Sequence, residues 1–551
     1  LWQAYDPSPA FRDAMNELAN SSYDSLAERD SLFEFCLEES MRFAVRIWMI
    51  DGQNFTPRRA TTTIANNVGQ GVVTEIWPFT ARFQEMEGGD LKLGTPDLFR
   101  EPWNPVAGSS YIYDAFPMSG TADFALLQDP HTGLPMAQRV ESAAVTVKTG
   151  TPTTSTEPWV TLSFEDVINV PADAWAEWDA TAKQFIPASI KYPGGTTAQV
   201  KSVVTYPVDM FSTVTWHDGS PLSIGDFVYN MILPEDRSDP ASPIYDSDFS
   251  AFSYFESRGV IGIRITDLNP LTIETYHNNR SIDAENLVKT WWPEENYGPS
   301  PWHTTALAAF AEADGTLAFS ESKSSSLGVP WTNYLHGDSL GILAAKLSAV
   351  IPNSYLPYIP TMSNYVNQAE VDSRWSNLTA WYTAQGHFWV GSGPLFVDTY
   401  DWGAKTLTLT RFEDFPDPSN KWASFQEGSV HALSIDYPYG APGSTFIIIG
   451  QYFPPNVEAT VSVNGTVVGS VMTDSEGEFE LSLTMDPDSL FGWYIITVSV
   501  SGQLKQVISE SVMIRLDEAT PPRVHDPLNQ DMLAPLIDPI VPKLFLPLLL
   551  R

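Results

Sequence analysis

The sequence predicts an α/β protein of more than one domain, with an all-β domain near its C-terminal end. Three observations support this prediction. The chain has 551 residues, and single hydrophobic cores stop growing at roughly 250–300 residues. Segments with helical spacing of apolar residues alternate with segments of period 2. Around residue 430 the composition shifts to short strand-like runs separated by Gly, Pro, Asn and Asp turns.

Residues 1–97 are expected to belong to an α/β lobe. Ser8-Pro9 is typical of a helix start, because a serine cap and a proline both suit the first turn. Apolar residues then keep helical spacing to residue 44, and residues 45–50 indicate a short strand. Glycines between residues 69 and 94 are predicted to separate further short strands, one of them over 72–77.

Residues 98–430 are expected to form the largest part of the α/β fold. Residues 140–215 alternate in period 2 and predict mostly strands, with one candidate short helix at 172–178. A helix capped by Ser223 is predicted near 224–232, and two strands joined at 267–270 follow. Residues 281–385 are expected to be mostly helical, and 405–411 to be a strand.

Residues 431–516 have the pattern of an immunoglobulin-like β-sandwich, with about seven short strands over roughly 85 residues. Residues 517–551 form a tail with a proline every few residues and an apolar end, so no regular helix is expected there. An apolar end of this size needs a cover, which the protein's own body, a partner or a membrane can provide.

The composition excludes several classes of protein. With 67 acidic and 30 basic residues, the net charge of -37 argues against binding to nucleic acid or to anionic lipid. The single cysteine, Cys36, permits neither an intrachain disulfide nor a thiolate metal site. Motifs for phosphate loops, dinucleotide folds, zinc proteases and serine hydrolases are absent from the sequence. We therefore expect no cofactor, no metal, no catalytic residues and no enzymatic activity.

The pair His217-Asp218 has two interpretations. It is either a catalytic or metal-binding pair, or a structural hydrogen-bonding pair in the strand-to-helix turn that Gly219 completes. The turn context favours the structural interpretation.

Tryptophan is over-represented, with 18 copies, many of them in turn-rich segments. Aromatic platforms suit the capture of peptides or sugars in a cleft, whereas packing in a large core is the ordinary use of such residues. The candidate ligand-binding residues are those in aromatic, loop-rich positions: Arg46, Trp48, Trp103, Tyr111, Tyr113, Asp114, Trp331 and Trp389.

Three segments together resemble family 5 extracellular solute-binding proteins, the peptide- and oligosaccharide-capturing subunits of ABC importers. The first is Trp216-His217-Asp218-Gly219-Ser220-Pro221-Leu222 with Asp226-Phe227-Val228, the second is Gly391-Ser392-Gly393-Pro394 with 411–415, and the third is 104–135. The resemblance covers roughly residues 1–425 and is closest to large archaeal and thermophile members.

The resemblance implies a two-lobe fold of the periplasmic-binding-protein type II class, in permuted order. Residues 1–97 would be the end of the second lobe, and 98–430 the first lobe and hinge. The sandwich follows the hinge almost at once, so part of the second lobe is expected to be absent or carried by a companion polypeptide. The acidic residue that holds a peptide's amino terminus in relatives has no matching motif here.

The expected function is therefore capture of a peptide or oligosaccharide for an ABC permease, outside the cell and tethered to the membrane in the full precursor. The chain begins at Leu1, which fits a processed or truncated piece. Sequons suggest a glycoprotein, and they lie at Asn20, Asn54, Asn279, Asn377 and Asn464. The alternative is a structural surface protein that reuses the same scaffold in an assembly.

Overall fold

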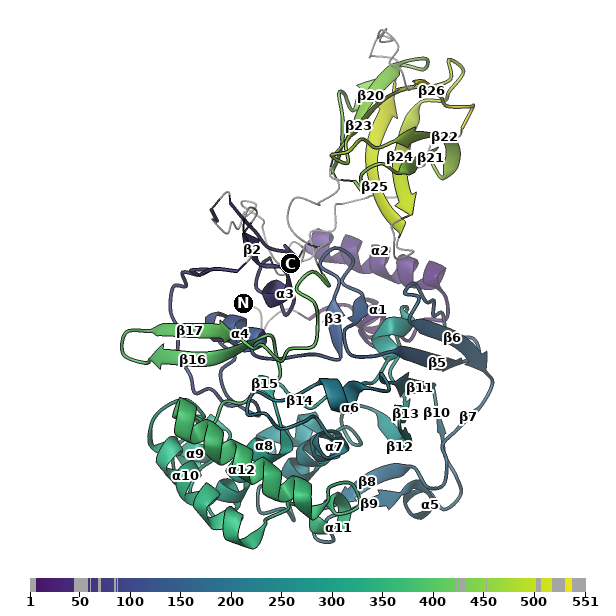
Figure 1. Ribbon diagram of the computed structural model, residues 1–551. Coiled ribbons are helices and arrows are strands. Elements are labelled where there is room, and N and C mark those ends of the chain that lie inside the picture. Colours follow the sequence, from purple (N-terminus) through teal and green to yellow (C-terminus); the bar gives the residue numbers. More distant parts are fainter. Residues whose placement is uncertain are drawn as a thin grey trace. The chain divides into compact units, whose positions relative to one another are not determined.

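A computed structural model describes residues 6–43, 58–59, 61–67, 71–83, 86, 88–422, 425, 432–451, 453–501, 507–517 and 531–537. The chain divides into two compact units (Figure 1). The first comprises Leu1–Arg58, Gln70–Phe79 and Gly88–Lys421, and the second Arg59–Gly69, Thr80–Glu87 and Trp422–Arg551. The main division, after Lys421, lies close to the predicted boundary at residue 430. The protein is mixed α/β, as the sequence predicts.

The large sheet of the first unit has seven strands in the order β6-β5-β11-β13-β12-β8-β9. Strands β5 and β6 pair in parallel, and the other neighbours are antiparallel. The alternating sequence of β11 buries every second residue, as period 2 requires. The strands of this sheet are β5 (Ser142–Lys148), β6 (Val160–Glu165), β8 (Trp175–Asp179), β9 (Gln184–Pro187), β11 (Val200–Thr205), β12 (Val260–Leu268) and β13 (Leu271–His277).

The other strands described in the first unit form short two-stranded pairs. These are β3 (Leu126–Gln128) with β4 (Pro135–Ala137), β7 (Ile168–Asn169) with β10 (Thr197–Ala198), β14 (Glu294–Glu295) with β15 (Gly298–Pro299), and β16 (Leu395–Asp401) with β17 (Thr406–Arg411).

The helices of the first unit fall mainly where helical spacing predicts them. They are α1 (Pro9–Ala19), α2 (Leu26–Phe43), α4 (Ile112–Gly120), α5 (Ala188–Lys191), α6 (Met210–Thr213), α7 (Ile224–Ser238), α8 (Trp302–Ala313), α9 (Glu321–Leu327), α10 (Asp338–Val350), α11 (Ile359–Met362) and α12 (Gln368–Gln385). Among the described residues, 3₁₀ turns accompany them at η2 (Ser247–Phe252), η3 (Ala284–Leu287) and η4 (Ile351–Asn353). No helix that the structure describes combines the length and the apolar character needed to cross a membrane.

Helix α7 lies at the centre of the main core. Ser223 caps it in a reciprocal capping box, in which its Oγ accepts from the helix and the Asp226 carboxylate accepts from Ser223 N. Tryptophan contributes heavily to this core, which explains much of its abundance. The fully buried tryptophans are Trp103, Trp216, Trp292, Trp302, Trp375 and Trp389.

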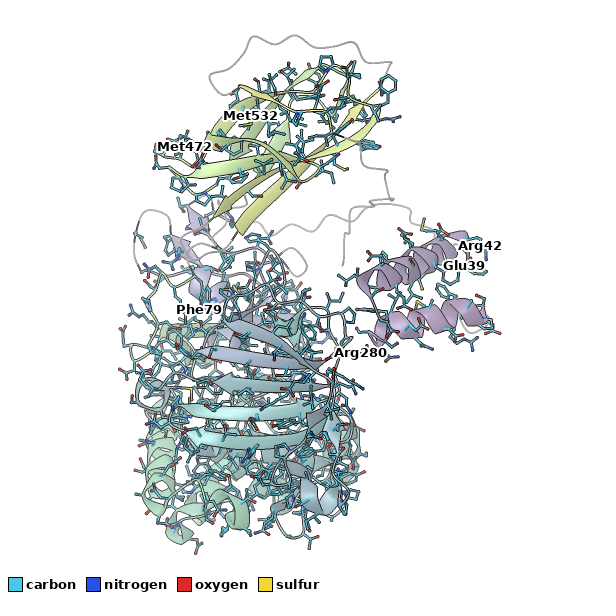
Figure 2. The ribbon with its side chains drawn as sticks, turned by 90° about the vertical axis from the view of Figure 1, so that its right-hand side faces the viewer. Glu39, Arg42, Phe79, Arg280, Met472 and Met532 are labelled. Carbon is cyan, nitrogen blue, oxygen red and sulfur yellow. The ribbon has the colours of Figure 1, made fainter. Side chains whose placement is uncertain are left out.

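Helices α1 and α2 form a hairpin with a small apolar core of its own, made by Phe11, Ala14 and Cys36. The Ser8 Oγ accepts from Phe11 N at 3.2 Å, which confirms the predicted helix start. Figure 2 labels Glu39 and Arg42 on the outer end of α2, where they form an ion pair. The strand predicted at 45–50 lies outside the described residues.

Two local predictions are wrong. Instead of a strand over 72–77, the chain has turns and then one helical turn, α3 (Trp77–Thr80), because Pro78 suits a first helical turn and buries Trp77 and Phe79 beside it. The candidate helix at 172–178 is mostly strand β8. Its Trp-Ala-Glu-Trp-Asp sequence buries Ala176 and Trp178 on one face, and that period of 2 outweighs the helical propensity of alanine.

The second unit is mainly β structure around a separate apolar core. Its four-stranded sheet has the order β18-β20-β23-β26 and its five-stranded sheet β19-β25-β24-β21-β22, and residues of both bury into one cluster. Its strands are β18 (Ala432–Ile435), β19 (Tyr439–Gly440), β20 (Thr445–Gln451), β21 (Glu458–Val463), β22 (Thr466–Met472), β23 (Phe479–Thr484), β24 (Gly492–Ser501), β25 (Val507–Leu516) and β26 (Asp531–Leu533), together with the short pair β1 (Thr62–Thr63) and β2 (Arg82–Phe83).

Part of the predicted tail belongs to this β core. Strand β26 pairs in parallel with β23, and Met532 (labelled in Figure 2) and Ala534 are buried in the cluster. Met532 and Ala534 are therefore covered by the protein's own second unit. The apolar end at 538–551 lies outside the described residues.

Candidate ligand-binding site

The Trp216–Gly219 segment forms a tight turn before helix α7, and Thr215 and Pro221 on either side of it pair in an isolated antiparallel bridge. Trp216 N donates to Ser220 O at 2.8 Å, and Gly219 has a φ of 83°, a left-handed conformation that glycine adopts freely. This geometry confirms the turn that the sequence predicts.

The His217 ring joins this turn to the Gly391–Gly393 segment. Its Nδ1 accepts from Gly391 N at 3.1 Å, so its Nε2 carries the proton and donates to Gly393 O at 3.0 Å. Burial lowers the pKa of His217 to about 4. The imidazole is therefore neutral at ordinary pH and holds two distant segments together, which supports the structural interpretation.

The Gly391–Gly393 segment in turn packs against the end of helix α4. Gly393 N donates to Thr121 O at 3.0 Å, and a Cβ on Gly391 would lie 1.9 Å from the same oxygen. Only glycine permits this approach. The motif turn thus fixes the position of residues 121–122, through a chain of backbone contacts.

Asp218 and Asp226 belong to a buried polar network that reaches helices α8 and α12. The Asp218 carboxylate accepts from His303 Nε2 at 2.8 Å, and His303 Nδ1 accepts from Arg374 at 3.3 Å. Burial alone would raise the pKa of Asp218, but its interactions with His303, with Ser220 N–H and with Arg374 lower it.

Arg374 closes this network on the α7 cap. Its Nη2 lies 2.7 Å from Asp226 Oδ2, and the two side chains are 1% and 0% exposed. Asp226 also accepts from Trp216 Nε1 and Trp302 N. The Arg374 and Asp226 side chains are therefore paired with each other inside the core. They hold the Trp216–Leu222 turn against helices α8 and α12, and a ligand cannot reach them.

A cavity of about 750 Å³ lies in the first unit, away from the Trp216–Leu222 turn, and 21 residues line it. Its walls come from the α4 helix and the serines before it, the β3–β4 hairpin, and the segment around η2. The β14–β15 hairpin forms its acidic side with Glu294 and Glu295. Apolar wall residues include Met118, Phe124, Leu126, Leu127 and Phe252, and the charged ones are Glu75, Arg258, Glu294 and Glu295.

Two adjacent carboxyl groups in this cavity hold their protons unusually strongly. Burial, with the nearby charges of Glu75, Asp123 and Glu295, raises the pKa of Glu294 to about 8. Burial also raises the pKa of Glu295 to about 7, against the opposing effect of Arg237 and Arg258. Groups that titrate near neutrality inside a cavity are typical of functional sites.

The predicted ligand residues Trp103, Asp114 and Trp389 are buried in the core and do not line the cavity. Trp389 packs against the hairpin that carries the glutamates, since a Cβ on Gly298 would lie 2.8 Å from its ring. Trp103 lies 5.0 Å from Trp389 between ring centroids. For these two tryptophans the ordinary packing role holds, and they support the cavity wall from behind.

Asp114 organises the segment before α4. Its carboxylate accepts from Phe99 N at 2.6 Å, Arg100 N at 3.1 Å and Ser109 Oγ at 3.0 Å. It is fully buried, and these hydrogen bonds brace the segment.

The other predicted residues are partly exposed or outside the described residues. Tyr113 lies on α4, the helix that lines the cavity, and Tyr111 directly precedes it; the centroids of their two rings are 5.2 Å apart. Trp331 donates its Nε1 to Ala107 O and Phe319 O. Arg46 and Trp48 lie outside the described residues.

The sequons differ in their surroundings. Asn20 is exposed after α1, while Asn464 sits in the β21–β22 turn with its Oδ1 accepting from Ile495 N. The Asn377 Nδ2 donates to Ser220 Oγ, and Asn279 is partly buried. Asn54 lies outside the described residues. Glycosylation of all five stays a prediction.

Sequence reasoning missed the glutamates of the cavity. The signal was available in Trp291-Trp292-Pro293-Glu294-Glu295, where two adjacent acids directly follow a strongly apolar run. Such a placement favours burial of carboxyl groups. The chain has 67 acidic residues, and most of them do not follow an apolar run, so this pair does not stand out by residue type.

Within the described part of the chain, no group of three or more His, Cys, Asp or Glu side chains has the geometry of a metal site. Comparison of the chain with models of protein families gave no match, and comparison with curated proteins gave none.

Proposed function

We propose that the protein is a substrate-binding subunit of an ABC importer, which captures a small organic ligand, a peptide or an oligosaccharide, outside the cell. The observation that carries this proposal is the cavity of about 750 Å³ in the first unit. Small-molecule sites are typically concavities of roughly 300–1,000 Å³ with mostly apolar walls and a few polar groups. The cavity fits this description.

The finer architecture is part of the same proposal. The first unit would be the first lobe of a type II binding-protein fold with an incomplete second lobe, and the second unit an immunoglobulin-like sandwich. The three segments that carry the family resemblance support this. Two of them, the Trp216–Leu222 turn and the Gly391–Pro394 segment, bind each other through His217 and fix Ala122, which lines the cavity.

A screen of ligands tests the proposal. The full chain is mixed with short peptides and with oligosaccharides, and its thermal unfolding is followed by tryptophan fluorescence. A ligand that binds the folded state alone raises the unfolding temperature. At a ligand concentration of a hundred times its Kd, the free energy of unfolding increases by about 2.7 kcal/mol. If neither class of ligand changes the unfolding temperature, the proposed function fails.

The structural alternative makes a different prediction. The second unit exposes large apolar side chains, among them Leu490 and Phe491, which are 56% and 51% exposed, and such residues favour contacts with other molecules. Electron microscopy of native material distinguishes the two functions, because an assembly protein forms a lattice or filament and a tethered receptor does not.

A further inference from the structure

The charge of the cavity lining is uneven. Three lining residues are acidic, Glu75, Glu294 and Glu295, and one is basic, Arg258. With all of them ionised the lining would carry an excess of negative charge in a partly enclosed space, where charges interact more strongly than in water. A cationic ligand group is therefore favoured over an anionic one.

The acidic groups have different neighbours. Glu295 faces the guanidinium groups of Arg237 and Arg258, and Arg258 itself lies against the rings of Phe252 and Tyr254 at 5.2 and 5.0 Å. Positive charge is thus already present on that side of the cavity.

Glu294, in contrast, interacts with Glu75, Asp123 and Glu295, which are all carboxyl groups. Asp123 is paired with Arg139, which offsets part of its negative charge. The corner between Glu294 and Glu75 is the place where a ligand cation has the most to gain.

An unsatisfied acceptor on the neighbouring glutamate, Glu295, points to a second ligand donor in the cavity. Oε1 of Glu295 is buried, and no donor in the described part of the chain hydrogen-bonds to it. Buried acceptors are almost always paired, and each exception calls for an explanation such as an ion, a water or a ligand. A ligand N–H group that enters the cavity would supply the missing partner.

We propose that this cavity binds an alkylammonium group, with the ammonium at Glu294 and Glu75 and the aliphatic stem along the apolar wall of Met118, Phe124 and Leu126. The inference rests on the proposed function and adds the chemical class of its ligand. A free aliphatic diamine and the lysine side chain of a short peptide both carry this group.

Binding is coupled to proton release. The Glu294 carboxyl group is largely protonated near pH 7 without ligand, and the ligand ammonium favours the carboxylate. The O–H bond of the carboxylic acid breaks and its proton goes to the buffer, while the ligand keeps its own proton. The affinity therefore rises with pH between about pH 6 and about pH 8 and falls on acidification.

Calorimetric titration of the full chain tests the inference with three probes: 1,5-diaminopentane, the peptide Gly-Lys-Gly with both termini blocked, and Gly-norleucine-Gly, blocked in the same way, as its uncharged match. Titrations in two buffers with different ionisation enthalpies count the protons released. We expect at least one of the two cationic probes to bind with release of up to about one proton, and about tenfold or more weaker binding of the norleucine peptide. Diamine binding identifies a free amine as the source, and binding of Gly-Lys-Gly alone identifies a peptide.

The variant Glu294→Gln keeps the size and the neutral form of the side chain, so it is expected to fold. It should bind the cationic probe about tenfold or more weakly, without proton release. The matched control is Glu413→Gln, because the Glu413 side chain is 77% exposed, and it should bind as the original chain does.

Equal affinity for the lysine and norleucine peptides, or unchanged binding by Glu294→Gln, would overturn the inference. The proposed function would survive that result if neutral peptides or sugars bind and the cavity variant Ala115→Trp abolishes their binding. Absence of binding by every probe and by the peptide and oligosaccharide screen would overturn both.

Discussion

Replacing Arg374 by methionine tests how the resembling motif is held in the core. The Arg374 and Asp226 side chains are 1% and 0% exposed and 2.7 Å apart. Removing one partner of such a pair leaves a buried charge uncompensated, which costs about 3–5 kcal/mol. Asp226 keeps its hydrogen bonds from Trp216, Ser223 and Trp302, so we expect a loss near the lower limit, about 3 kcal/mol.

Denaturant unfolding followed by tryptophan fluorescence measures this loss, because most tryptophans of the chain are in the first unit. The double variant Arg374→Met with Asp226→Asn should recover part of it, since the buried charge is then gone. Arg264→Met is the matched control. Arg264 and Asp173 pair at the surface with 41% and 65% exposure, and such a pair contributes about 1 kcal/mol or less. Equal losses for Arg374→Met and Arg264→Met would refute the bracing role of the network.

Three further predictions concern glycine, pH and the tail. In thermal unfolding, Gly391→Ala should destabilise the first unit by about 2 kcal/mol or more, because its Cβ would meet Thr121 O. The control Gly341→Ala in α10 has open space at its Cβ and should be neutral or stabilising by up to about 1 kcal/mol. Similar effects of the two substitutions would contradict the close approach. The rise in the pKa of Glu294 from 4.5 to about 8 corresponds to roughly 5 kcal/mol of stability that is present at low pH and lost as pH rises through about 8. In urea unfolding, Glu294→Gln should therefore stabilise the chain at pH 9 and have little effect at pH 4. Stabilisation at pH 4 and not at pH 9 would contradict the raised pKa. Met532→Asp should destabilise the second unit by about 2–4 kcal/mol by placing a charge in its core, measured by circular dichroism, with Leu533→Asp, whose residue is 75% exposed, expected to have little effect.

Much of the secondary structure could be predicted because local signals and tertiary packing agree. The Ser223 cap, the β12–β13 hairpin and the strands of the second unit all follow patterns of a few residues. Prediction failed where these levels conflict. In β8, Trp175 and Trp178 have a helix-like spacing, but the segment is a strand of period 2. Residues 72–76 form turns, and Pro78 lies in the helical turn Trp77–Thr80 that follows them.

The candidate site was predicted less well, for a physical reason. Aromatic residues in loops were expected to meet a ligand, but a core of this size needs large side chains, and Trp103 and Trp389 fill it. The cavity depends on segments far apart in the chain, from Glu75 to Gly298. No local pattern reveals which of many glutamates such a distant arrangement encloses.

The proposed function requires that the cavity of the first unit holds a ligand. The most direct measurement compares ligand binding by the original chain with binding by Ala115→Trp, in which an exposed alanine on the cavity wall is replaced by a bulky ring. We predict that a peptide, amine or sugar found in the screen binds the original chain and loses about tenfold or more of its affinity in the variant. Equal affinity for the two proteins, with both folded, would contradict it.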